Sequence, residues 1–196
     1  MSSTVEQPDS FVYSNENMKM AEIIIARYPQ GRQQSAVLPL LDLAQRQAGW
    51  LPRAAVHYVA DLLEMADIRV WEAATFYTMY FLEPVGQTCI NVCTTTPCWL
   101  RGSADIVAAC EGALGIGLGE TTDDSAFTLR EVECLGACVN APMVQIGDDY
   151  YEDLTPESAV ALIETIKSGT SPTPGPQSAR RSSEPLSGAK VLKAEG

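Results

Sequence analysis

The chain has 196 residues, and its 25 acidic and 13 basic side chains give a formal net charge of −12. Its length allows one domain or two small ones, and its hydrophobic fraction of 46% is too high for a wholly disordered chain. No run of about 18 apolar residues is present, which excludes a membrane-spanning helix, and the acidic excess argues against binding to nucleic acid or to an anionic lipid surface.

The first 13 residues are predicted to be a flexible N-terminus. Residues 1–10, MSSTVEQPDS, contain neither a basic-then-apolar signal peptide nor an arginine-rich transit segment. We therefore expect the chain to remain in the cytoplasm, a reducing compartment. There, six cysteines are better explained by metal or redox chemistry than by a disulfide framework.

A cysteine-free region, residues 14–84, is predicted to form a small helical bundle. Apolar residues recur at helical spacing between Met18 and Tyr28, and Ser14 is the expected N-cap of this helix. Further helices are expected over residues 33–48, 53–65 and 70–81.

Two features of this region add detail. Pro39 lies inside the second helical stretch, so it predicts either a kink or a helix that starts later. An aromatic group is expected to pack in the bundle core, with packing on a partner protein as the alternative; it consists of Phe76, Tyr77, Tyr80 and Phe81.

The next region, residues 85–168, is predicted to be an α/β domain of thioredoxin-like type. Strands are expected over residues 88–92, 127–132, 143–146 and 150–151, and helices over residues 100–114 and 156–166. A right-handed crossover places the first two strands in parallel, and a hairpin adds an antiparallel pair. The remaining residues, 169–196, are rich in proline, serine and glycine, contain no aromatic residue, and are predicted to be a disordered tail.

Four cysteines lie in loops that follow predicted strands. Cys93 and Cys98 follow the first strand, and Cys134 and Cys138 follow the second. Because consecutive parallel strands of a strand–helix–strand unit end at the same edge of a sheet, we expect all four sulfur atoms to converge. Their spacing leaves three kinds of site open, and plain core thiols with no bound group remain a further alternative.

Structural zinc is one alternative, although zinc knuckles usually place two residues between paired cysteines, whereas these pairs enclose four and three. A [2Fe–2S] cluster suits the wider spacing, because each of its irons takes two protein thiolates. Gly136 and the hydroxyls of residues 94–96 are candidate donors to its sulfurs, and the helix dipole at Cys98 would favour a thiolate there. A redox-active disulfide is the third alternative, but it usually needs Cys-x-x-Cys.

Both loops resemble those of a known family. Residues 93–102, CTTTPCWLRG, and 132–143, VECLGACVNAPM, are similar to the two cluster loops of the E-type (24 kDa) subunit of NADH:quinone oxidoreductase, respiratory complex I. Flanking residues 74–80, ATFYTMY, and 118–122, LGETT, agree as well. The resemblance extends from about residue 11 to residue 167.

This resemblance implies a helical N-terminal segment and a thioredoxin-like domain that holds one [2Fe–2S] cluster through Cys93, Cys98, Cys134 and Cys138. It also implies that the chain exchanges single electrons with FMN on a partner flavoprotein that binds NADH, alongside other peripheral-arm subunits, on the inner face of the bacterial inner membrane. Related subunits serve NAD-linked formate dehydrogenases and hydrogenases, so these complexes remain alternatives, as does a zinc-stabilised interaction module. No catalytic residue and no nucleotide-binding motif are expected on this chain.

The remaining candidates are interpreted as structural. Cys89 and Cys110 are expected to be buried small hydrophobes, with an auxiliary or swapped ligand role as the alternative for Cys89. His57 is expected to be a surface or packed histidine rather than a metal ligand. Between residues 111 and 164, many acidic side chains accompany one arginine, Arg130. Because negative charge opposes reduction, a low potential is expected, about −400 mV or somewhat above.

Overall fold

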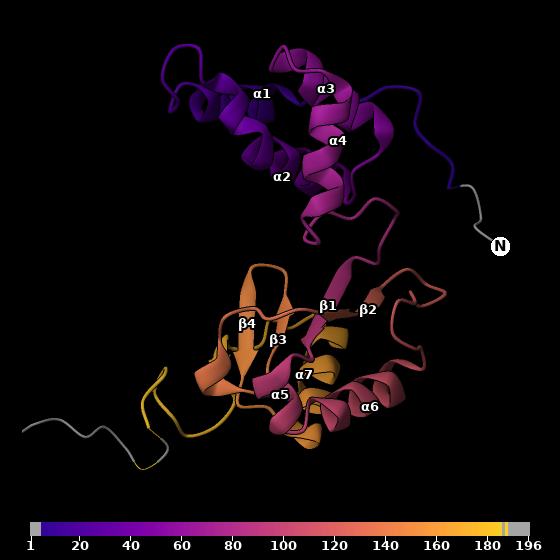
Figure 1. Ribbon diagram of the computed structural model, residues 1–196. Coiled ribbons are helices and arrows are strands. Elements are labelled where there is room, and N and C mark those ends of the chain that lie inside the picture. Colours follow the sequence, from indigo (N-terminus) through magenta and orange to yellow (C-terminus); the bar gives the residue numbers. More distant parts are fainter. Residues whose placement is uncertain (1–4, 186, 188–196) are drawn as a thin grey trace, which may run out of the picture. The chain divides into compact units, whose positions relative to one another are not determined.

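The computed structural model describes residues 5–185 and 187, and it divides into two compact units, Met1–Val85 and Gly86–Gly196 (Figure 1). The division lies one residue beyond the border expected from the change in sequence pattern. None of the helices in the described part of the chain combines the length and apolar character needed to traverse a bilayer.

The first unit is helical, as predicted. Its elements are α1 (Asn15–Ile25), the 3₁₀ turn η1 (Gln33–Ala36), α2 (Val37–Ala48), α3 (Arg53–Leu62) and α4 (Asp67–Phe76). The Oγ atom of Ser14 accepts a hydrogen bond from the Asn17 N–H at 3.1 Å, which confirms the predicted N-cap. Pro39 lies in the first turn of α2, where its missing N–H leaves no helical hydrogen bond unmade, so the α-helix starts later than residue 33.

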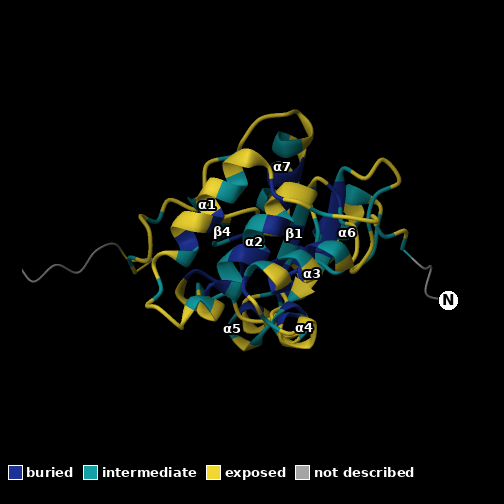
Figure 2. Cartoon of the chain, turned by 90° about the horizontal axis from the view of Figure 1, so that it is seen from above, coloured by how far each residue is buried: buried dark blue, intermediate teal, exposed yellow. Residues whose placement is uncertain are grey.

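The core of this unit is built around α2 and α3. Leu40 and Leu41 of α2 are fully buried, and so are Val56 and Val59 of α3. Figure 2 shows the buried faces of these helices in dark blue and their exposed faces in yellow. The Tyr13 hydroxyl donates to the Leu40 carbonyl at 2.6 Å, which ties the segment before α1 to α2.

The aromatic group splits between core and surface. Tyr80 is 4% exposed, and its hydroxyl donates to the Leu38 carbonyl at 2.8 Å. Phe76, however, is 76% exposed, so its expected place in the core is wrong. Phe76 is the last residue of α4 and lies on the side of the helix away from the buried Val70 and Ala74. Because α4 ends there rather than at residue 81, Phe76 does not share a helical face with Tyr80.

The second unit contains a five-stranded mixed sheet. Its strands are β1 (Thr88–Cys93), β2 (Phe127–Val132), β3 (Val144–Ile146), β4 (Asp149–Glu152) and β5 (Gly175–Pro176). They are ordered β2-β1-β3-β4-β5, with β1 parallel to β2 and β3 antiparallel to both β1 and β4. This arrangement confirms the predicted crossover and hairpin of a thioredoxin-like fold.

Two helices cover one face of this sheet. The helices of the unit are α5 (Thr96–Leu100), α6 (Ser103–Leu114) and α7 (Pro156–Lys167), and a 3₁₀ turn, η2, spans Cys138–Asn140. Ile90 and Val92 of β1 share a buried cluster with Ile106 of α6 and Ile163 of α7. Because side chains two residues apart on a strand point to the same face, α6 and α7 pack on the same side of β1.

The structure differs from the expected disordered tail over residues 169–185. Gly175–Pro176 forms β5, which pairs in parallel with β4, and the Gln177 N–H donates to the Glu152 carbonyl at 2.8 Å. Its composition predicts disorder because the segment has little apolar surface to bury. It is ordered instead by backbone hydrogen bonds to β4 at the edge of the sheet, which composition does not reveal. Residues 186 and 188–196 of the predicted tail lie outside the described residues.

The start of the second unit gives a stability prediction. A Cβ atom on Gly86 would lie 2.6 Å from the backbone carbon of Phe127, so Gly86→Ala must displace β1 from β2. We expect Gly86→Ala to lower the free energy of unfolding by about 1–3 kcal/mol, measured by urea denaturation of the purified protein. Gly112→Ala in α6 is the matched control, because its Cβ would meet open space in a helix interior and should stabilise slightly. Equal stabilities of the two variants would contradict this description.

Candidate metal centre

Parallel pairing of β1 with β2 brings the two cysteine loops to one edge of the sheet. Cys93, the last residue of β1, lies opposite Val132, the last residue of β2, and the Thr94 N–H donates to the Val132 carbonyl at 3.4 Å. Cys134 follows two residues after Val132. In the first loop, Thr94 and Thr95 separate β1 from α5, and α5 brings Cys98 within hydrogen-bonding distance of Cys93.

The first pair of thiols is buried. Cys93 is 2% exposed and Cys98 is 1% exposed. Burial alone would raise the pKa of Cys93, but hydrogen bonds from the Thr95 hydroxyl and the Leu135 N–H outweigh it and lower that pKa. The Cys93 Sγ and Thr95 Oγ1 atoms are 3.4 Å apart. Cys93 is therefore the thiol of this loop that ionises first.

Cys98 behaves oppositely. Burial, followed by the hydrogen bond to Cys93 and the charge on that residue, raises the pKa of Cys98 to about 12. The expectation that the helix dipole would favour a Cys98 thiolate is therefore wrong for the metal-free protein. Desolvation and the neighbouring sulfur raise this pKa although Cys98 lies in α5, and the Met143 N–H, which donates to the Cys98 sulfur, acts to lower it.

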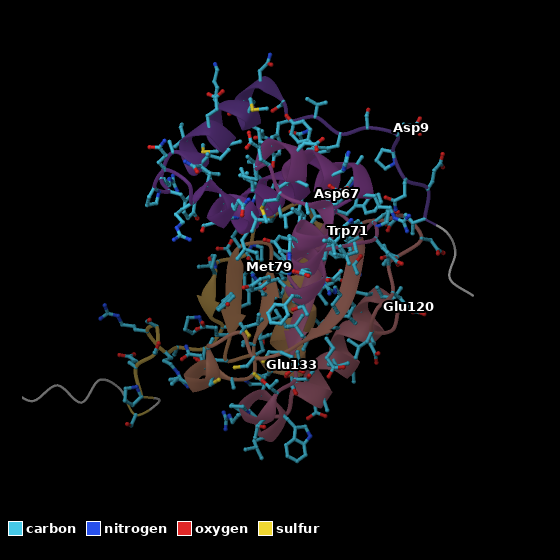
Figure 3. All side chains as sticks on the ribbon, turned by 45° about the horizontal axis from the view of Figure 1, so that its top comes forward. Asp9, Asp67, Trp71, Met79, Glu120 and Glu133 are labelled. Carbon is cyan, nitrogen blue, oxygen red and sulfur yellow. The ribbon has the colours of Figure 1, made fainter. Side chains whose placement is uncertain are left out.

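The second pair of thiols is exposed to solvent. Cys134 and Cys138 have their Sγ atoms 3.3 Å apart. Glu133, labelled in Figure 3, lies between the end of β2 and Cys134. A hydrogen bond from the Gly136 N–H, together with one from Cys138, lowers the pKa of Cys134. The pKa of Cys138 is raised, chiefly because its proton is shared with Cys134. Gly136 adopts a φ of +87°, which a residue with a Cβ rarely adopts, and this places its N–H toward the sulfur.

Contacts across the two loops unite the pairs in one site. Cys138 interacts electrostatically with both Cys93 and Cys98, and the Thr95 hydroxyl hydrogen-bonds Cys134 as well as Cys93. The structure therefore brings together all four cysteines that the sequence singled out. Within residues 5–185 and 187, no three histidine, cysteine or carboxylate side chains gather closely enough to hold a single metal ion.

The grouping of the thiols fits a two-iron cluster. Each loop holds one thiol with a lowered pKa and one with a raised pKa: burial chiefly raises the pKa of Cys98, the hydrogen bond to Cys134 chiefly raises that of Cys138, and in both loops repulsion by the neighbouring thiolate adds to these causes. A cation bound to a pair replaces the shared proton and removes this repulsion. Two such pairs side by side match a cluster in which each iron takes two protein thiolates.

Some donors in the site were predicted and others were missed. Thr95 and Gly136 donate to cysteine sulfurs as expected, whereas the Thr94 hydroxyl donates instead to Glu131 at 2.5 Å. The backbone N–H groups of Leu135 and Met143 were missed. Backbone donors carry no residue-type signal, so only the fold could reveal them.

The two other cysteines lie apart from this centre. Cys110 is 1% exposed in the core between α6 and the sheet, and burial raises its pKa to about 11. Cys89 is half-buried in β1, and burial raises its pKa despite the opposing effect of Arg130. Cys110 therefore confirms the expectation of a buried small hydrophobe, whereas Cys89 is only partly buried, lies outside the core cluster and hydrogen-bonds to Asn91 and Arg130.

His57 lies on the exposed side of α3. Its Nδ1 atom is 2.8 Å from Asp67 Oδ2, and its Nε2 atom is 3.7 Å from Asp61 Oδ2. The hydrogen bond to Asp67, with the charges of both carboxylates, raises the pKa of His57. This residue is a surface histidine paired with acids, which is one of the two environments expected for it.

Comparisons with known proteins agree with this geometry. A family model described as thioredoxin-like [2Fe-2S] ferredoxin matches residues 21–167. A protein of Rickettsia bellii, named as the E-type subunit of NADH-quinone oxidoreductase, is 58% identical over 159 residues, which cover 81% of this chain and 95% of that protein. A protein of Rickettsia felis with the same name is 60% identical over 156 residues, which cover 79% of this chain and 93% of that protein.

A solved structure supports the fold. The NAD⁺-reducing [NiFe]-hydrogenase in its air-oxidized state aligns with a TM-score of 0.57 and 22% identity. The alignment covers 66% of this chain and 23% of the hydrogenase chain. At this identity the likeness shows a shared fold alone.

The opposite pKa directions of Cys134 and Cys138 predict a difference in reactivity. In the metal-free protein near neutral pH, iodoacetamide should alkylate Cys134 several-fold faster than Cys138, because a thiol with a lowered pKa is a thiolate at lower pH. Peptide mass spectrometry over a pH series measures both rates. Since both residues are exposed, access does not explain a difference. Faster alkylation of Cys138 would contradict the hydrogen-bond pattern.

Proposed function

Because this chain belongs to the thioredoxin-like [2Fe–2S] ferredoxin family, we propose that it is the electron-transfer subunit of the NADH-oxidising module of an NADH:quinone oxidoreductase. The observation that carries this proposal is the 58–60% identity to proteins named as the E-type subunit of NADH-quinone oxidoreductase, over nearly their whole length. The chain acts in that enzyme as an electron carrier, and catalysis on NADH belongs to a partner.

The ligands proposed for the cluster are Cys93, Cys98, Cys134 and Cys138. When bound, a [2Fe–2S] cluster accepts or releases one electron at a time. The pairing of a readily ionised thiol with a resistant one in each loop supports this ligand set.

Several groups of the chain stabilise negative charge on these sulfurs. The Leu135 and Gly136 N–H groups and the Thr95 hydroxyl donate to Cys93 and Cys134. Such charge-assisted hydrogen bonds stabilise a more negative site and therefore act to raise its potential. They oppose the surrounding carboxylates, from which the sequence predicts a low potential.

The surface near the loops supports docking on a partner. Trp99 and Leu100 of α5 and Val139 after the second pair are exposed apolar side chains, and Cys134 and Cys138 are exposed as well. The proposed partner is the flavoprotein that holds FMN and NADH, and the chain exchanges single electrons with that flavin. The assembly, with other peripheral-arm subunits, is proposed to lie on the inner face of the bacterial inner membrane.

The companions of the chain test which complex it joins. An affinity-tagged copy purified from native membranes should retain subunits of a quinone reductase, including a flavoprotein. Retention of a molybdenum or nickel protein would instead assign the chain to a formate dehydrogenase or a hydrogenase.

Cysteine replacement tests the ligand set. Serine at position 93, 98, 134 or 138 should abolish or strongly alter the visible absorbance and the electron paramagnetic resonance (EPR) signal of the reduced protein, because each change removes one iron–thiolate bond. Cys110→Ser is the control: the residue is buried in the α6 core, so this variant should keep the wild-type spectrum even if it is less stable. A wild-type spectrum in any of the four loop variants, or its loss in Cys110→Ser alone, would refute the assignment.

A further inference from the structure

A segment near the C-terminus runs along the edge of the sheet beside the second cysteine loop. We call residues 175–184 the C-terminal strap. It begins as β5, where Gly175 pairs with Tyr151 and Pro176 pairs with Glu152 of β4. The strap lies beyond residues 21–167, which the family model matches, so the family pattern does not account for it.

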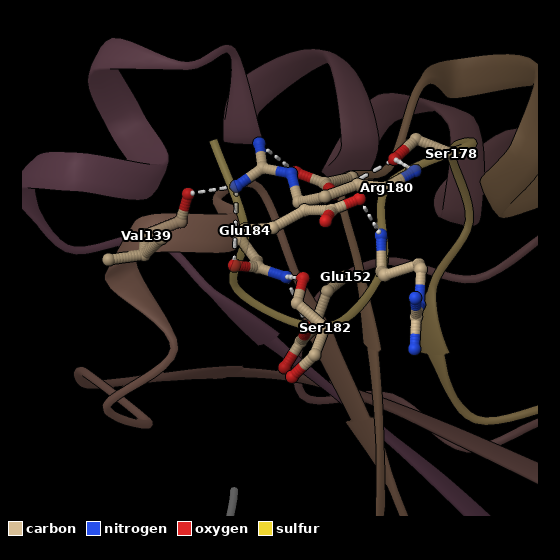
Figure 4. Close-up of polar contacts among 9 residues, drawn as sticks. Val139, Glu152, Ser178, Arg180, Ser182 and Glu184 are labelled. Atoms are coloured by element: carbon tan, nitrogen blue, oxygen red, sulfur yellow. Dashed lines mark hydrogen bonds and ion pairs between the residues drawn. The ribbon is translucent and has the colours of Figure 1, made fainter. Parts of the chain in front are cut away.

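Arg180 anchors this strap in a buried ion pair. Its Nη2 atom is 2.9 Å from Asp153 Oδ1, and both side chains are 7% exposed. Its Nη1 atom donates to the Val139 carbonyl (Figure 4), at a distance of 3.1 Å. The same atom lies 3.4 Å from Asn140 Oδ1. The Ser178 hydroxyl completes the arrangement by donating to Asp153 Oδ2 at 3.0 Å.

Asn140 provides a second connection to the strap. It is 2% exposed, and its Nδ2 group donates to the Ser182 carbonyl at 2.9 Å and to Glu152 Oε2 at 2.7 Å. The Asp153 N–H donates to the Asn140 carbonyl at 2.7 Å. The strap, the end of β4 and η2 are therefore joined by one polar network (Figure 4).

This network holds the residues that directly follow Cys138. Cys138 begins η2, a 3₁₀ turn of three residues, and such a short turn has little stability of its own. Its backbone is therefore positioned by partners outside the loop. Arg180 binds the carbonyl of Val139 and the side chain of Asn140, the next two residues along the chain.

The cost of burying Arg180 indicates a positioning role. Desolvation of a guanidinium and a carboxylate offsets most of their attraction, so a buried ion pair is weak support for net stability. In the described part of the chain, Arg180 Nε is also a buried side-chain nitrogen without a hydrogen-bond partner. What the planar guanidinium does provide is a fixed geometry, because it reaches Asp153 and Val139 at once.

We propose that Arg180 is a positioning residue for the metal centre, because it fixes the orientation of Cys138 through its contacts with Val139 and Asn140. The C-terminal strap holds Arg180 in the place where it makes these contacts. This inference rests on the proposed function, because ligation of iron by Cys138 belongs to that function. Partners of metal ligands commonly change metal retention by about tenfold or more when removed.

Arg180→Met tests the proposal in the full-length, cluster-containing protein. The methionine keeps an unbranched side chain and removes the charge and the fork of donors. We expect iron release to a chelator to become roughly tenfold faster and the EPR g-values of the reduced protein to shift, because the Cys138 sulfur loses its fixed orientation. Circular dichroism should show unchanged secondary structure.

The neighbouring Arg181→Met is the matched control. Arg181 is exposed, and its backbone N–H, which the substitution retains, donates to Glu184 Oε1 at 2.9 Å. This variant should show the wild-type rate of iron release and the wild-type EPR spectrum. Wild-type behaviour of Arg180→Met in both measurements, or equal changes in the two variants, would overturn the proposal.

Two further measurements keep the test decisive if Arg180→Met folds poorly or the wild-type protein binds no cluster. Asp153→Asn removes the negative charge that pairs with Arg180 but keeps the side-chain volume, and asparagine tolerates the φ of +53° found at this position. This variant should reproduce the faster iron release of Arg180→Met. In the metal-free chain, hydrogen exchange of the Asn140 N–H, which donates to the Ala137 carbonyl at 2.9 Å, should be faster in Arg180→Met than in Arg181→Met. Equal exchange rates in the two variants would refute the positioning role of Arg180. This result is independent of the cluster, so it can be told apart from a failure of the proposed function, which the absence of iron would show.

Discussion

The parallel pairing of β1 with β2 is the constraint on which the metal centre depends. It sets Cys93 opposite Val132, so that the chain leaves both strands at the same edge of the sheet and the two loops meet there. A slip of one residue in this pairing would point Cys93 to the other face. The helices α6 and α7 pack on Ile90 and Val92 of the same strand, so the hydrophobic core that stabilises the unit also fixes the register of the ligands.

In each loop, the arrangement of the thiols suits a bound cofactor better than it suits the metal-free protein. Cys93 and Cys134 are stabilised as thiolates by backbone and hydroxyl donors. Burial chiefly keeps the proton on Cys98, and the hydrogen bond to Cys134 chiefly keeps the proton on Cys138. The buried first loop is held by α5 and the sheet, whereas the exposed second loop needs support from outside. The network of Arg180, Asp153 and Asn140 provides that support, because it holds the two residues that directly follow Cys138.

Much of this site could be predicted from the sequence because its signals are local or follow topology rules. The strand–helix–strand order predicted that Cys93 and Cys134 lie at the same edge of the sheet. The positions of Cys98 and Cys138 in the same two loops added the other two members of the site. The exposed place of Phe76 was missed because helical periodicity does not show where a helix ends. The raised pKa of Cys98 was missed because burial is a tertiary property, and the strap was missed because its hydrogen bonds are made with β4 and η2 rather than within its own sequence.

The content of the purified protein tests the central claim most directly. Anaerobically purified, full-length chain should contain about two iron atoms and two acid-labile sulfides per polypeptide, as one cluster clasped by two pairs of thiolates requires. One zinc ion per polypeptide with no labile sulfide, also after reconstitution with iron and sulfide, would contradict the account.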